Sequence, residues 1–116
     1  MYKFSYTLKV ETEKEITFLG DSLQRIREFP DAARKELGFQ LHRVQHGLEP
    51  LDWKPMKTVG TGVREIRIHA GGEFRTLYIA NIGNELYVLH AFQKKTRKTS
   101  QKDIDLAKER LKKIGG

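Results

Sequence analysis

Residues 63–92 of the chain read VREIRIHAGGEFRTLYIANIGNELYVLHAF, and they predict the centre of the fold. Three runs within this stretch, residues 63–69, 74–80 and 85–92, are rich in Val, Ile, Tyr and Phe, the residue types that favour β-strands. The connections, residues 70–73 and 81–84, contain glycine and have the length of hairpin loops. We therefore expect an antiparallel meander of three strands.

The segments before the meander predict two strands and two helices. Residues 2–10 alternate apolar and polar side chains, as in a half-buried strand, and residues 16–19 read as a second, short strand. Asp21 or Ser22 would cap a first helix that ends at Pro30. A second helix would follow and end at Gly47, and its apolar stripe consists of Ala33, Leu37, Leu41 and Val44.

The remaining segments predict a loop and a C-terminal helix. Residues 48–62 hold two prolines and two glycines around a lone Trp53, which favours a loop. Ser100 and Asp103 resemble a capping box at the start of a helix whose core-facing stripe consists of Ile104, Ala107, Leu111 and Ile114.

Together these elements predict an α+β fold, in which two N-terminal helices and a C-terminal helix pack on one face of a mainly antiparallel sheet. At 116 residues the chain fits one domain, residues 1–116, with residues 1–14 as an N-terminal extension strand.

The net charge of +7 is concentrated near the C-terminus, where residues 94–116 contain nine Lys or Arg and only three acids. The hydrophobic run 86–92 leads directly into Lys94, Lys95, Arg97 and Lys98. A strand that delivers cations at its end holds them on a rigid scaffold, which suits an anionic ligand such as nucleic acid. The alternative interpretation of this region is a solvated, lysine-rich helix.

Two absences from the sequence bear on the compartment. The chain contains no cysteine, which fits a reducing environment and excludes disulfides and thiolate chemistry. Neither a signal peptide nor a run of about 18 apolar residues is recognisable. We therefore expect a cytoplasmic protein with no membrane partner.

Alternation along the strands places the candidate site residues. Side chains at every second position share a face, so Glu65, Arg67 and His69 are expected to line a polar face of the first meander strand. Arg75 shares its parity with Leu77 and Ile79, which places a cation on an apolar face. Two explanations stay open: a bulge re-aims Arg75 at the end of its strand, or the open face of the sheet is itself partly apolar.

Metal binding is disfavoured because His42 and His46, at helical spacing, have no third ligand nearby, and we expect no cofactor. His90 shares parity with Leu86 and Val88 and is expected to be a partly buried, hydrogen-bonded histidine. His69 is the best candidate for acid or base chemistry, since a histidine titrates near neutral pH. Trp53 is more typical of a core edge than of a base-stacking platform.

Four ordered segments resemble the phage-derived, HigB-like branch of the RelE/ParE toxin superfamily. They are Trp53-Lys-Pro-Met-Lys57, Gly62-Val-Arg-Glu-Ile-Arg-Ile68, Phe74-Arg-Thr-Leu-Tyr78 and Leu89-His-Ala-Phe-Gln-Lys-Lys-Thr96 followed by Lys98-Thr99. The resemblance covers about residue 16 to the C-terminus. It implies a RelE/ParE-like fold and the toxin of a type II toxin–antitoxin pair, which enters the ribosomal A site and cuts messenger RNA without a metal ion. A helix-turn-helix antitoxin would be its partner.

The resemblance also implies roles for individual residues. Arg75 and Lys95 would contact the scissile phosphate, with Lys94 in the same active site, and Arg67 or His69 would transfer protons. The residues expected to hold RNA or ribosome backbone are Lys54, Lys57, Arg64, Arg97 and Lys98. The chain departs from the family pattern in having no tyrosine after Lys94 and no C-terminal histidine.

Two other functions remain open at the level of the sequence. A ParE-like toxin would bind DNA gyrase and would have no hydrolytic site of its own, and a shared fold does not separate it from the ribonuclease. A basic nucleic-acid-binding module would have no activity at all. The clustered Arg and Lys side chains favour the ribonuclease, because a gyrase-binding protein does not need several cations directed at one phosphate.

Overall fold

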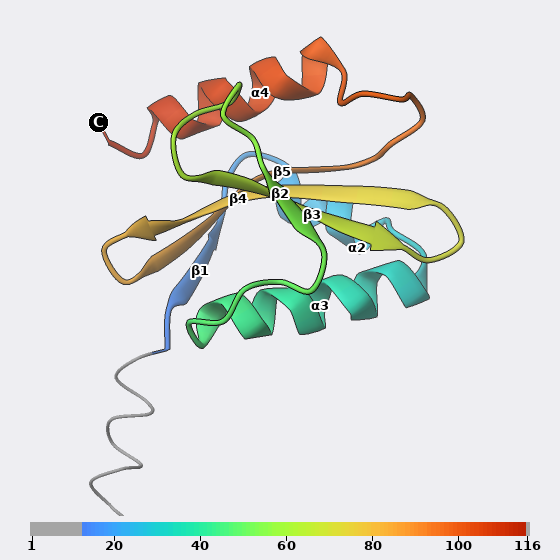
Figure 1. The fold of residues 1–116 in the computed structure, drawn as a ribbon, viewed down its shortest axis with the longest axis horizontal. Helices are drawn as coiled ribbons and strands as arrows, with labels where there is room; N and C mark the ends of the chain where they lie inside the picture. Colours follow the sequence, from blue (N-terminus) through green and yellow to red (C-terminus); the bar gives the residue numbers. More distant parts are fainter. Residues whose placement is uncertain (1–12, 116) are drawn as a thin grey trace, which may run out of the picture.

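The computed structural model describes residues 13–115, which form a five-stranded sheet and three helices (Figure 1). The elements follow the chain in the order β1 Glu15–Phe18, α2 Ser22–Arg27, α3 Asp31–Gln45, β2 Trp53–Pro55, β3 Val63–His69, β4 Glu73–Ile82, β5 Glu85–Gln93 and α4 Gln101–Lys112. The predicted α+β class is confirmed. The strand predicted at residues 2–10 lies outside the described residues.

The sheet has the strand order β1-β5-β4-β3-β2, in which β1 runs parallel to β5 and all other neighbours are antiparallel. The predicted meander is therefore confirmed as β3, β4 and β5. The prediction of a loop throughout residues 48–62 was wrong, because β2 lies within it and pairs with residues 64–66 of β3. A three-residue edge strand that ends in proline carries little sequence signal, and proline is tolerated there because an edge strand need not donate on both sides.

Helices cover both faces of the sheet, which corrects the expectation that all of them pack on one face. On one face α2 and α3 bury an apolar cluster against the sheet, and on the other face α4 buries a second cluster (Figure 1). Ile66 and Ile68 of β3 belong to the first cluster, whereas Leu77 and Ile79 of β4 belong to the second. Both faces of the central strands are therefore partly apolar, and each attracts a helix.

Local sequence signals account for the two longer helices. The stripe on α3 is buried as predicted, with Ala33 and Leu37 fully inaccessible. At the start of α4 the Ser100 hydroxyl accepts a hydrogen bond from the backbone N–H of Asp103, and it donates one to the Asp103 carboxylate. The predicted cap is thus confirmed, although the reciprocal bond runs between the two side chains. Among residues 13–115, no helix is both long and apolar enough to cross a lipid bilayer.

A register shift on β5 changes which way its side chains point. Leu77 pairs with His90 and the next residue, Tyr78, pairs with Val88, so Leu89 is an extra residue on β5. Such a bulge interrupts alternation. Leu89 and His90 consequently both point toward α4, whereas Val88 and Ala91 pack under α2 and α3.

Candidate active site

Charged side chains gather at the end of the sheet where β3 ends, β4 begins and β5 leaves for α4. The register pairs Arg67 with Arg75 and His69 with Glu73, which brings the predicted residues of two strands together. We call this group the charged cluster; it consists of Asp52, Glu65, Arg67, His69, Glu73, Arg75 and Lys94. The connection from β5 to α4 arches over this side of the sheet (Figure 1).

Arg75 lies on the face that α4 covers, as its parity with Leu77 and Ile79 indicates. Of the two explanations left open by the sequence, the second holds: this face is apolar under α4 and charged beyond it. The Arg75 residue is only 5% exposed, and its guanidinium donates to the Glu73 carboxylate at 3.1 Å and to the Phe74 carbonyl at 3.0 Å. A cation held this firmly is preorganised to meet an anion.

Glu65 does not line an exposed polar face, contrary to the prediction. It is completely buried, and its carboxylate accepts a hydrogen bond of 2.8 Å from the Thr99 hydroxyl. Arg75 Nε and Lys54 Nζ lie 3.7 Å and 3.9 Å from the other carboxylate oxygen. The face of β3 that alternation predicted to be polar and exposed is therefore partly buried.

His69 lies between two carboxylates at the surface. Its Nδ1 is 2.8 Å from Glu73 and its Nε2 is 2.8 Å from Asp52. Hydrogen bonds to Glu73 and then to Asp52 raise the pKa of His69 above its usual value. Conversely, the hydrogen bond from His69 lowers the pKa of each carboxyl group. His69 is therefore biased toward its protonated form, which can donate a proton.

Arg67 is the second predicted proton-transfer residue, and it is half-buried beside the same acid. Its guanidinium nitrogens Nε and Nη2 both lie 2.9 Å from one oxygen of Asp52. Arginine stays protonated at any physiological pH, so Arg67 supplies positive charge and cannot act as a base. Of the two candidates, only His69 has a side chain that titrates near neutral pH.

Lys94 joins the charged cluster, whereas Lys95 does not. The Lys94 backbone N–H donates to the Glu73 carbonyl at 2.7 Å, and its side chain is half-buried. Desolvation, followed by the nearby charge of Arg75, lowers the pKa of the Lys94 ammonium. Lys95 is exposed, and within the described chain no hydrogen bond or ion pair joins its side chain to the cluster.

Four of the five cations predicted to hold RNA backbone line a single groove beside the cluster. The groove lies between the segment that begins with β2 and the connection from β5 to α4, and it encloses about 470 Å³. We call it the basic groove and define it by Lys54, Lys57, Arg97 and Lys98. Met56 and Ile104 contribute apolar surface to the same groove. Cations from two segments far apart in the sequence thus face one open channel.

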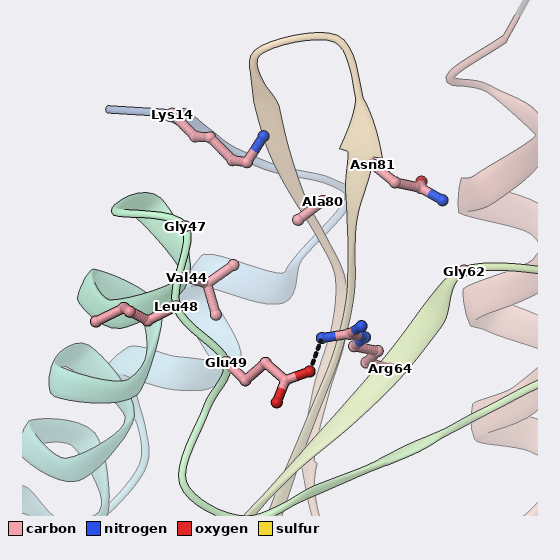
Figure 2. Close-up of a pocket in the computed structure, with 9 residues that line it drawn as sticks. All are labelled: Lys14, Val44, Gly47, Leu48, Glu49, Gly62, Arg64, Ala80 and Asn81. Carbon is pink, nitrogen blue, oxygen red and sulfur yellow. Dashed lines mark ion pairs between the residues drawn. The ribbon is translucent and has the colours of Figure 1, made fainter. Parts of the chain in front are cut away.

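Arg64 is the exception, because it lies apart from the other four cations. It lies on the face covered by α3, where it turns toward Glu49 with 3.6 Å between Nη1 and Oε2 (Figure 2). Its guanidinium carbon also stands 4.0 Å from the ring centroid of Trp53, a cation–π distance. Trp53 is accordingly covered by Arg64 at the edge of the sheet.

The other histidines take structural positions. His90 is hydrogen-bonded as predicted but fully buried rather than partly buried. The bulge turns it toward α4, where its Nε2 lies 2.7 Å from the Asp103 carboxylate. The rings of His42 and His46 face each other at 4.3 Å on α3. Within residues 13–115, no three His, Cys, Asp or Glu side chains converge in a way that could hold a metal ion.

Of the three carboxylates in the cluster, Asp52 and Glu73 were missed at the level of the sequence, and Glu65 was expected on an exposed face. Each of them holds one or two of the predicted cations. Alternation did contain an indication that Glu65 is buried, because Glu65 falls on the same face of β3 as Val63. The strand register agrees, since Glu65 lies opposite Leu77 of β4. Asp52 lies in a loop, and only the tertiary structure brings it to β3.

The family model described as phage derived protein Gp49-like (DUF891) matches residues 24–112, which is most of the chain. This match includes α3, the meander and α4, and therefore every residue of the charged cluster and the basic groove. No curated protein matches the chain significantly.

Proposed function

The chain belongs to the phage-derived Gp49-like family, and we propose that it is a type II toxin that cleaves messenger RNA on the ribosome without a metal ion. The family is associated with toxins of toxin–antitoxin systems, and the HigB-like assignment is part of the proposal. The observation that carries it is the convergence of Arg75 and His69 on the Glu73 carboxylate. The Lys94 backbone binds the Glu73 carbonyl, and its ammonium lies near enough to Arg75 for that charge to lower its pKa, beside the basic groove.

The proposed reaction is an internal transesterification at a phosphodiester of the RNA. The ribose 2′-oxygen attacks the adjacent phosphorus, the new O2′–P bond forms and the P–O5′ bond breaks. The products are a 2′,3′-cyclic phosphate and a 5′-hydroxyl end. Negative charge builds up on the phosphoryl oxygens in the transition state, and Arg75 is placed to stabilise it because its buried guanidinium needs little reorganisation.

Two protons must move in this reaction. His69 donates to the departing 5′-oxygen, because its two carboxylate neighbours favour the protonated imidazole. Lys94 accepts the proton of the 2′-hydroxyl, since burial and Arg75 favour its neutral amine relative to an ordinary lysine. Lys95 contacts the phosphate from the exposed side.

The basic groove holds the RNA backbone on either side of the scissile bond. Its four cations offer phosphate contacts that do not depend on sequence. An antitoxin of the helix-turn-helix class is the proposed partner, and it would neutralise the toxin by covering the basic groove. Action on ribosomes implies that the single domain works in the cytoplasm.

Mapping RNA ends in cells that express the protein tests the proposal. We expect cuts within translated messages that stop when translation is blocked, with 5′-hydroxyl ends downstream of each cut. Arg75→Ala should lower the cleavage rate on programmed ribosomes by about 10²–10³-fold, the effect of losing one preorganised charge-stabilising group. Arg34→Ala is the matched control, because Arg34 lies on α3 in an ion pair with Asp31.

Three outcomes would contradict the proposal. Intact messages together with double-strand DNA breaks would support gyrase poisoning instead. Products with 5′-phosphates would exclude attack by the 2′-hydroxyl. Equal cleavage rates for the two variants, Arg75→Ala and Arg34→Ala, would show that the charged cluster takes no part in the reaction.

A further inference from the structure

Glu65 occupies a position where an apolar side chain would be expected. It lies on β3 two residues after the buried Val63, it pairs with Leu77 of β4, and it is completely inaccessible to solvent. A buried carboxylate is costly, and an ion pair in its place is often no more stabilising than apolar residues of similar size. Stability of the fold therefore gives no reason for a carboxylate here.

The contacts of Glu65 come from three separate segments. Arg75 belongs to β4, Lys54 belongs to β2, and Thr99 belongs to the connection between β5 and α4. That connection also carries two of the four basic-groove cations, Arg97 and Lys98. Glu65 therefore contacts the segment that begins with β2, strand β4, and the connection from β5 to α4. Together with β3, these segments supply all the cations of the charged cluster and the basic groove.

The pair of Glu65 and Arg75 is held by charge alone. Within residues 13–115, neither Glu65 Oε1 nor Arg75 Nε has a hydrogen-bond partner, although both atoms are buried and lie 3.7 Å apart. Thr99 occupies only the second carboxylate oxygen of Glu65. The carboxylate therefore fixes where the guanidinium lies without using up its Nε–H as a donor.

We propose that Glu65 is a positioning residue, which fixes Arg75 and Lys54 directly and the connection from β5 to α4 through Thr99. Its effect on catalysis rests on the function proposed above, whereas its effect on Arg75 does not. Glu65 takes no proton in the reaction, since it has no exposed atom that could reach an RNA hydroxyl.

Glu65→Gln tests this role because it keeps the size of the side chain and removes the charge. We expect the single-turnover cleavage rate to fall by about 10²-fold, the scale of a small misplacement of a catalytic group. The shape of the pH–rate profile should stay the same. In the Arg75→Ala background, Glu65→Gln should have a smaller effect than in the wild type, since its influence on Arg75 is already lost and only its contacts with Lys54 and Thr99 remain. Glu109→Gln, an exposed change on α4, is the matched control.

A second measurement does not depend on activity. The Arg75 side chain is 7% exposed, so its Nε–H should give a resolved NMR signal that exchanges slowly with water and is absent from Arg75→Ala. In Glu65→Gln this signal should exchange at least about tenfold faster, while Glu109→Gln leaves it unchanged. If wild-type protein cleaves no RNA, the proposed function fails, and this measurement still decides the role of Glu65.

Several results would overturn the role of Glu65. They are an unchanged Arg75 signal in Glu65→Gln, additive losses of rate in the double variant, or disappearance of one limb of the pH profile. If Glu65→Gln does not fold, Thr99→Val tests the same carboxylate from its other side. Removal of the Thr99 hydroxyl should loosen residues 94–99 and accelerate exchange of their backbone amides, and unchanged exchange there would contradict the proposal.

Discussion

The salt dependence of RNA binding is a quantitative test of the basic groove. Each cation that neutralises a phosphate of single-stranded RNA displaces condensed counterions, which makes log K fall with log[salt] by about 0.7 per contact. Lys54, Lys57, Arg97 and Lys98 line the groove, so the slope should be about −2.8. A rise from about 50 to about 200 mM salt should therefore weaken binding by about 50-fold.

The double variant Lys57→Ala/Lys98→Ala removes two of the four contacts. Its slope should be about −1.4, so the same rise in salt should weaken binding by only about sevenfold. Fluorescence anisotropy with a labelled single-stranded 2′-O-methyl RNA measures this slope, because that RNA lacks the attacking hydroxyl and stays intact. Neither lysine forms an ion pair within the described chain, so the variant should fold like wild type.

Lys35→Ala is the control, since Lys35 is exposed on α3, which packs on the opposite face of the sheet. Its slope should equal that of the wild type. The reasoning is refuted if the double variant keeps the wild-type slope, or if Lys35→Ala lowers the slope as much as a groove lysine does. Either result would mean that RNA binds by diffuse positive charge.

Three further predictions concern pH and stability. The pH–rate profile should bend downward at the raised pKa of His69, because only the protonated imidazole donates, and His69→Gln should lack this bend; a wild-type profile without the bend would contradict the acid role. Asp103→Ala should lower the free energy of unfolding in urea by about 1–3 kcal/mol, since it leaves the buried His90 unpaired, and an unchanged midpoint would exclude this contact as stabilising. Arg25 and Arg110 lower the pKa of Asp21, so its stabilising effect should be present above its unfolded pKa of about 4 and vanish as pH falls through the lower folded value. Asp21→Asn should therefore melt below the wild type at pH 7 and together with it in strong acid; equal melting temperatures at pH 7 would count against this pair.

Short-range sequence patterns were enough for most elements. The apolar stripe of α3, the glycine-bearing hairpins of the meander and the Ser100 cap each depend on residues within one or two turns of the chain. These elements can be predicted from the sequence because side-chain periodicity and helix capping involve residues that are close together in the chain. The prediction failed for β2, because this strand is only three residues long and no sequence pattern indicates that it pairs with β3.

The face on which each helix packs required the tertiary structure. Apolar residues on both sides of β4 allow helices on either face, so the alternation was compatible with one covered face or two. The bulge at Leu89 had no sequence signal and changed the direction of His90, which parity placed with Leu86 and Val88. One inserted residue reverses alternation for everything beyond it.

The amino-acid sequence alone defined which charges this protein has and, through strand alternation, that Arg75 shares the face of its strand with Leu77 and Ile79. The tertiary structure decided which cations meet: it separated Arg64 from the basic groove, left Lys95 outside the charged cluster and brought Asp52 to His69. The reason is that an ion pair forms across a few ångströms of space, regardless of distance along the chain. Which carboxylate holds which cation is therefore known only once the strands are paired.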